Sequence, residues 1–206
     1  MGGVLICGCS GRAPSGEFNP SESSIYIKED GSVSSASVEK TDQDYYSAED
    51  LTAFVQGKVD EFNGQRSAGA DSQGEGPVSV ASCTVETGEG LSLVKCILNY
   101  DSPETLLAFN QEIRNPEIAF TELATDSVSV ISQEEAFGQT AFTDSSGKAA
   151  ELSKVTGKGD LRAVRLNGAG LVQTEGDILY MSQGCVLEEE TVVRTPGEGV
   201  SYIIFQ

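Results

Sequence analysis

The sequence predicts an α+β fold, with a mostly antiparallel β-sheet built from hairpins and two amphipathic helices packed on one face. Three observations lead to this expectation: tight-turn signals between β-prone segments, two capped helical segments, and a C-terminal third rich in short β-prone segments. Because 38% of the 206 side chains are apolar, one core can form, and we expect a single domain over residues 25–206.

A first hairpin is predicted around Glu29-Asp30-Gly31-Ser32. Asp-Gly between extended segments is a strong hairpin signal, because both central turn residues must accept a positive φ. We therefore expect strands over 25–28 and 33–38.

The first helix is predicted to begin after Ser47, whose side chain can cap it, with Tyr46 and Leu51 in the hydrophobic-staple positions. Asn63-Gly64 predicts the end of this helix, and the Gly-, Ser- and Asp-rich composition of 65–77 predicts a loop. Apolar residues at helical spacing indicate a face that packs on the sheet: Leu51, Phe54, Val55, Val59 and Phe62.

A second hairpin is predicted from strands over 78–85 and 91–100, with Glu89 and Gly90 as its turn residues. In this register Ala81 lies opposite Leu98.

The same register places Cys83 opposite Cys96, at a non-hydrogen-bonded position. Cα atoms there lie ~4.5 Å apart, which is close enough for a disulfide. A cross-strand disulfide and two reduced core thiols are both compatible with the sequence. Cys185 stays unpaired in either case.

The second helix is predicted from Ser102-Pro103-Glu104 to about Arg114, because proline favours the first helical position and Pro116 bars continuation. Residues 118–124 fit either a strand or a helix. The alternation over 127–131 predicts a strand, whereas 133–158 gives no firm assignment.

The C-terminal third predicts short strands separated by Asn-Gly, Glu-Gly, Gln-Gly and Pro-Gly turns. Gly168-Ala169-Gly170 is interpreted as a turn between strands, and Glu188-Glu189-Glu190 as a solvated turn. The expected strands are 161–166, 170–174, 178–181, 191–194 and 200–205.

Gly8-Cys9 follows an apolar start and precedes a polar segment, which is the pattern of a bacterial lipoprotein. We expect 1–9 to be the remnant of a lipoprotein signal peptide with Cys9 as the lipidation site, and 10–24 to be a flexible tether. The alternative is a short apolar cytosolic N-terminus whose two cysteines are accidental or bind metal.

Thirteen basic and 32 acidic side chains give a formal charge of −19, which opposes binding to a phosphate backbone or to anionic lipid headgroups. Nucleic acid is therefore not expected as a partner, and membrane contact is expected through the lipid anchor only. The chain has no histidine, which excludes Ser-His-Asp and Cys-His nucleophiles and histidine-ligated zinc. Carboxylate pairs, Ser/Lys dyads and calcium sites remain, and no cofactor is expected.

Two further patterns resemble chemical sites. Ser145-Ser146-Gly147-Lys148 has the Ser-x-x-Lys spacing of penicillin-recognising enzymes, but the companion motifs are missing and Gly147 favours a turn. Asp42 and Asp44 are weak metal candidates, since acidic residues before a helix also favour its N-terminus.

The order of a lipid cysteine, a polar tether, Ile-Tyr-Ile-Lys-Glu-Asp-Gly-Ser-Val, Asp-Tyr-Tyr, a helix ending Phe-Asn and a terminal Tyr-Ile-Ile-Phe resembles an uncharacterised family of clostridial-type (Gram-positive) surface lipoproteins. Segments 25–62, 99–110 and 177–205 carry the resemblance, which covers under half of the chain. This sequence departs from the family pattern in its cysteine pair and in the irregular middle of the chain. The resemblance implies a lipid-anchored surface protein and assigns no functional residue.

The expected function is a lipid-anchored domain on the extracellular face of the cell membrane that binds an envelope or peptide ligand without catalysis. One alternative is a carboxylate-dependent cell-wall hydrolase, which requires two converging acidic residues, one with a raised pKa. Another is an assembly component of an envelope complex, which should show an exposed apolar patch.

Overall fold

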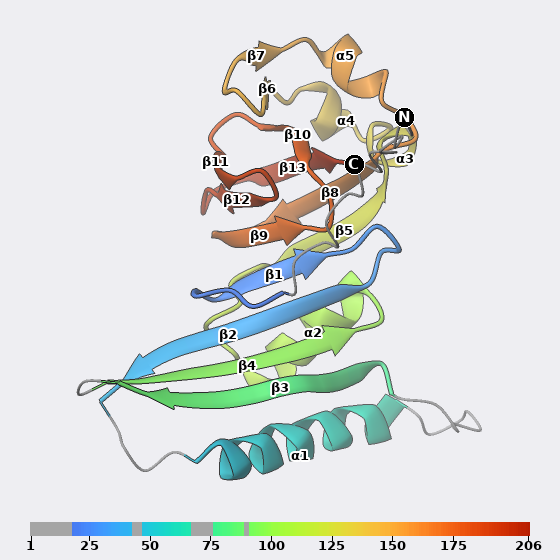
Figure 1. Ribbon diagram of the computed structural model, residues 1–206. Coiled ribbons are helices and arrows are strands. Elements are labelled where there is room, and N and C mark those ends of the chain that lie inside the picture. Colours follow the sequence, from blue (N-terminus) through green and yellow to red (C-terminus); the bar gives the residue numbers. More distant parts are fainter. Residues whose placement is uncertain (1–17, 43–46, 67–75, 89–90) are drawn as a thin grey trace, which may run out of the picture.

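A computed structural model describes residues 18–42, 47–66, 76–88 and 91–206. In these ranges 13 strands form two sheets, and five helices cover them (Figure 1). The predicted α+β class is confirmed. The expectation of one sheet is wrong, because strands far apart in the sequence pair into two separate sheets.

The first sheet contains seven strands, and all its pairings are antiparallel except that of β1 with β9. Their spatial order is β11 (Val186–Glu189), β12 (Val192–Thr195), β9 (Gly170–Thr174), β1 (Ser24–Ile27), β2 (Val33–Thr41), β4 (Ser92–Tyr100) and β3 (Val78–Thr87). The parallel β1–β9 pairing joins the N-terminal hairpin to the C-terminal third of the chain.

The second sheet contains six strands with antiparallel pairing throughout. Their order is β5 (Glu122–Ser127), β8 (Arg162–Asn167), β13 (Val200–Phe205), β10 (Ile178–Ser182), β6 (Phe142–Asp144) and β7 (Ala149–Ala150). Both faces of β13 are buried, because Ile203 and Phe205 belong to one core cluster and Tyr202 and Ile204 to another.

Glycine-containing turns in the C-terminal third carry the chain between the sheets. At Asn167-Gly168 the chain leaves β8 of the second sheet and enters β9 of the first. It crosses again at Glu175-Gly176, Gln183-Gly184 and Pro196-Gly197. Of the strands from β8 to β13, only consecutive β11 and β12 pair as a hairpin, so the expected hairpin organisation of this region is wrong.

Helix α1 (Ala48–Arg66) begins as predicted at Ser47, whose Oγ accepts the Asp50 N–H at 3.0 Å. It runs two residues past Gly64, so the expected stop is wrong. The Asn63 side chain binds both backbone groups of Val78 instead of ending the helix, and so ties α1 to β3. The staple residue Tyr46 lies outside the described residues.

Helix α2 (Pro103–Ile113) confirms the second predicted helix. The Ser102 side chain caps Thr105 N–H, and Arg114 in the left-handed region ends the helix. Phe109 of α2 contacts Phe62 of α1 edge to face, with ring centroids 5.2 Å apart. The two helices therefore share one face of the β2–β4–β3 part of the first sheet, as predicted.

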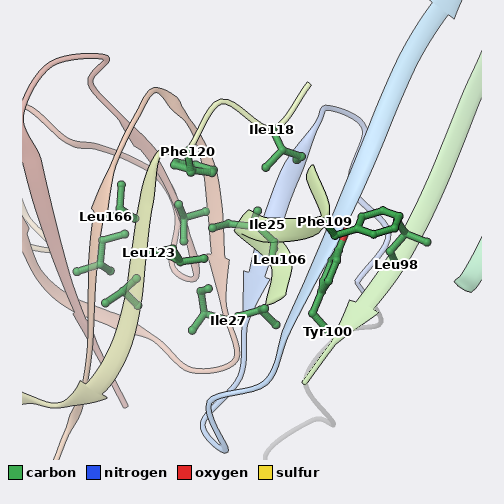
Figure 2. Close-up of a cluster of buried hydrophobic side chains, with 14 of the residues drawn as sticks. Ile25, Ile27, Leu98, Tyr100, Leu106, Phe109, Ile118, Phe120, Leu123 and Leu166 are labelled. Carbon is green, nitrogen blue, oxygen red and sulfur yellow. The ribbon is translucent and has the colours of Figure 1, made fainter. Parts of the chain in front are cut away.

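The main core runs continuously from the second sheet to the helix-covered part of the first sheet. Figure 2 shows Leu123 and Leu166 on one side, Ile25 and Leu106 in the middle, and Tyr100 beyond them. All five side chains are buried. One half of the first sheet thus packs against the second sheet, while α1 and α2 cover its other half.

A second core lies on the outer face of the second sheet, under three short helices: α3 (Val128–Ile131), α4 (Glu135–Gly138) and α5 (Leu152–Thr156). The predicted strand over 127–131 is therefore wrong. Val128 and Ile131 are buried at helical spacing, whereas Val130 is 47% exposed. The expected turn at Glu188–Glu190 is also partly wrong, because Glu188 and Glu189 belong to β11.

Candidate functional site

The predicted lipid and metal residues fall largely beyond the described part of the chain. Cys9 and Asp44 are not among the described residues, whereas Asp42 follows the end of β2. Within the described ranges, no group of three or more His, Cys, Asp or Glu side chains is arranged to hold a metal ion. No helix in those ranges is long and apolar enough to span a bilayer.

Two carboxylates converge on the guanidinium of Arg165 at the outer face of the second sheet. Glu122 Oε2 lies 2.6 Å from its Nη1, and Glu134 Oε2 lies 2.9 Å from its Nε. The Nε contact is an ion pair without an aligned hydrogen bond. The hydroxyl of buried Tyr202 donates to Glu134 at 3.0 Å. The two carboxylates therefore balance a cation and anchor a buried phenol.

Because side chains alternate along β8, Arg165 lies on the opposite face of the sheet from Val164 and Leu166. This alternation does not show what covers the Arg165 face, because Glu122, Glu134 and Tyr202 come from three other segments. The Arg165 cluster is therefore a feature that sequence reasoning missed.

Two buried phenols have raised pKa values. Burial raises the pKa of Tyr202 to about 12, and its hydrogen bond to the Glu134 carboxylate adds to the rise. Burial likewise raises the pKa of Tyr100 to about 12, against the opposing hydrogen bonds of Ser35 and Asn110. Both phenols stay neutral in the folded protein well above pH 10, where an unfolded tyrosine ionises.

We expect the protein to lose stability as the pH rises from about 10 to about 12. In that window the unfolded state releases tyrosine protons that the folded state retains, so the free energy of unfolding falls by about 1 to 3 kcal/mol. Urea unfolding across this range measures the loss, and the double variant Tyr100→Phe/Tyr202→Phe should flatten it. An unchanged slope in that variant would contradict the assignment to these two phenols.

Asp30 and Asp144 have lowered pKa values because each carboxylate accepts hydrogen bonds within a turn. The Ser32 hydroxyl donates to Asp30 Oδ1 at 2.7 Å, and the Ser32 N–H donates to it at 2.8 Å. The Ser146 hydroxyl and N–H bind Asp144 Oδ1 in the same way, at 2.7 and 2.9 Å. Ser145-Ser146-Gly147-Lys148 is thus the β6–β7 turn, as predicted.

The cysteine register is confirmed, since Cys83 on β3 lies opposite Cys96 on β4. Leu98 pairs with Val80, so the expected Ala81–Leu98 pair is wrong: a bulge around Ala81 shifts the register beyond it. Both thiols are free and partly exposed. Cys185 lies beyond β10, and burial raises the pKa of its thiol.

An apolar groove of about 300 Å³ lies between α1 and α2. Phe54, which we expected on the packed face of α1, is 65% exposed at this groove. Val55, Val59 and Phe62 lie along the side of α1 that faces the sheet. Phe54 lies on the neighbouring side of the helix, which faces the groove. The lining residues are Phe54, Val55, Lys58, Glu61, Phe109, Glu112, Ile113 and Arg114.

The spacing alone did not distinguish Phe54 from Val55, because residues at i+3 and i+4 both normally belong to the apolar stripe of an amphipathic helix. Which of them faces the sheet depends on how α1 is rotated about its axis, and the tertiary structure sets that rotation.

Comparisons with protein families, with curated proteins and with solved structures each found no match to the chain.

Proposed function

We propose that this chain is a lipid-anchored protein of the cell envelope, on the extracellular face of the membrane, and that its domain binds a partner without catalysis. The anchor part of the proposal rests on Gly8-Cys9 and the polar segment that follows it. The binding part rests on the groove between α1 and α2.

The groove carries the binding proposal because it combines an apolar floor with charges of both signs. Val55 and Ile113 are partly buried and supply apolar surface, with the buried Phe109 ring behind them, and Phe54 is exposed beside them. Lys58, Arg114, Glu61 and Glu112 complete the lining. An apolar centre with a polar, charged rim is the usual anatomy of a protein-binding surface. The groove therefore suits an apolar side chain presented by a protein or peptide segment.

The arrangement of the carboxylates favours binding over hydrolysis. A glycoside hydrolase needs two carboxyl groups facing the substrate, one with a raised pKa. Glu122 and Glu134 converge, but on Arg165. Among the described residues, the carboxyl pKa values that shift clearly are those of Asp30 and Asp144, and both are lowered.

The anchor is tested by Cys9→Ser in the precursor expressed in a lipoprotein-processing bacterium. We expect the unchanged protein in the membrane fraction with a diacylglycerol adduct on Cys9, and the variant without adduct and released from the membrane. Cys7→Ser is the matched control and should stay anchored. An unmodified Cys9 peptide in the unchanged protein would refute the anchor.

The groove is tested with Nile red, a neutral dye that fluoresces in apolar sites. Phe54→Ala should weaken dye binding severalfold without unfolding the protein, because the ring is 65% exposed beside the groove. Val186→Ala removes a similarly exposed apolar side chain, 59% exposed on β11, and should leave binding unchanged. Equal binding by all three proteins would contradict the groove as an apolar binding site.

A further inference from the structure

We propose that Cys83 and Cys96 form a reversible disulfide, made and broken by thiol–disulfide exchange while the domain stays folded. This inference is independent of the lipid anchor and of the α1–α2 groove. It assigns a modification site to β3 and β4, and its reactants are a disulfide-bearing partner for oxidation and a thiol for reduction.

Strand geometry brings the two sulfur atoms together. Cys83 and Cys96 are direct partners across the β3–β4 ladder. The Gly88 N–H donates to Leu91 O at 2.8 Å, and counting outward from this bond places the cysteines at a non-hydrogen-bonded position. Cα atoms at such positions are ~4.5 Å apart, within the range that a disulfide spans. No backbone movement is needed to close the bond.

The geometry also favours reversibility. A Cα separation of ~4.5 Å is at the short end of the disulfide range, and disulfides away from the preferred separation are easier to reduce. Both cysteines are partly exposed, so an attacking thiolate can reach the bond. Exposed or strained disulfides are the labile ones, in contrast to buried structural disulfides.

The thiols are linked to each other and to α1. The two sulfur atoms share a hydrogen bond, which lowers the pKa of Cys83 and, with burial, raises that of Cys96. Ionisation of one thiol is therefore supported by the proton of the other. The Thr52 hydroxyl of α1 also contacts Cys83, so the pair lies under the N-terminal half of this helix.

The exchange proceeds in two displacements. The Cys83 thiolate attacks one sulfur of a partner disulfide, forms a mixed disulfide and releases the first partner thiol. The Cys96 thiolate then attacks Cys83 Sγ, forms the cross-strand bond and releases the second partner thiol. Two S–H bonds and one partner S–S bond are lost, and one S–S bond and two partner S–H bonds form. The partner gains the two electrons and two protons that the cysteines lose.

The experiment exposes the reduced full chain to oxidised glutathione in native buffer, blocks free thiols with iodoacetamide and maps tryptic peptides. Trypsin cleaves after Lys95, so Cys83 and Cys96 fall in separate peptides, 67–95 and 96–114. A disulfide therefore appears as one linked peptide pair. We expect this pair in most molecules, and excess reduced glutathione should remove it without denaturant.

Two variants control the result. Cys185→Ala should give the same linked pair, whereas Cys83→Ala should abolish it and leave Cys96 alkylated or glutathionylated. Failure of the linked pair to form in native buffer, or its formation only in urea, would overturn the proposal. A linked pair that resists reduced glutathione until the protein is denatured would overturn its reversibility. A linked pair that forms and is reduced in the folded protein would establish the site.

Discussion

Phe109→Ala is expected to lower the free energy of unfolding by about 3 to 5 kcal/mol, which is the usual cost of removing a buried phenylalanine ring. Phe109 is fully buried and joins three elements. Its ring lies edge to face with Phe62 of α1 at 5.2 Å and tilted against Tyr100 of β4 at 6.0 Å. Deleting it removes the aromatic contact between the helices and loosens both from the first sheet.

Urea unfolding followed by far-ultraviolet circular dichroism measures this effect. Phe54→Ala deletes the same ring from a side chain that is 65% exposed, and it should change stability by no more than about 0.5 kcal/mol. Similar losses in the two variants would mean that Phe109 is not the link between α1, α2 and β4. A loss confined to Phe109→Ala supports the packing described above.

Gly168→Ala is expected to cost about 3 kcal/mol or more, through two separate effects. Gly168 has φ +135°, a backbone conformation that L side chains rarely adopt. A Cβ there would also lie 2.6 Å from the Ala119 carbonyl oxygen and 2.9 Å from the Phe120 Cα. Because Gly168 is where the chain crosses from β8 to β9, the strain falls on the junction between the two sheets.

Gly147→Ala separates the two effects. Gly147 has φ +77°, but a Cβ there would meet nothing within 4 Å. We expect a loss of about 1 kcal/mol from the backbone conformation alone. Calorimetric or urea unfolding of both variants tests the difference. An equal loss of stability in the two variants would mean that the close approach to Ala119 contributes nothing to the effect of Gly168→Ala.

Local signals predicted elements well where the local chain decides its own conformation. Ser47 and Ser102 cap the predicted helices, and Asp30-Gly31 lies in the predicted turn between β1 and β2. Only Gly31 of this pair has a positive φ, because the turn closes between Lys28 and Ser32 and not directly around Asp30-Gly31. The register of Cys83 against Cys96 also followed from a short turn, because few residues separate the two strands. Each of these features depends on residues within about a dozen positions of one another.

The candidate sites were less accessible from sequence because they combine distant segments. The groove needs α1 beside α2, and the Arg165 cluster needs β5, β8, β13 and the residue before α4. The strand assignment over 127–131 failed for a related reason. The five residues of this segment cannot establish a period, and the partner surface determined that Val128 and Ile131 face inward.

The sequence by itself determined the α+β class, the two capped helices, both N-terminal hairpins and the positions of the glycine-containing turns in the C-terminal third. Only the tertiary structure decided which strands pair. Asn167-Gly168 is the dipeptide that hairpin turns prefer, yet it passes the chain from the second sheet to the first. A glycine permits a positive φ in either kind of turn. Strand pairing depends on the burial of both faces of β13 and on the contact of β1 with β9. Both features involve residues far apart in the chain, so local sequence signals do not predict them.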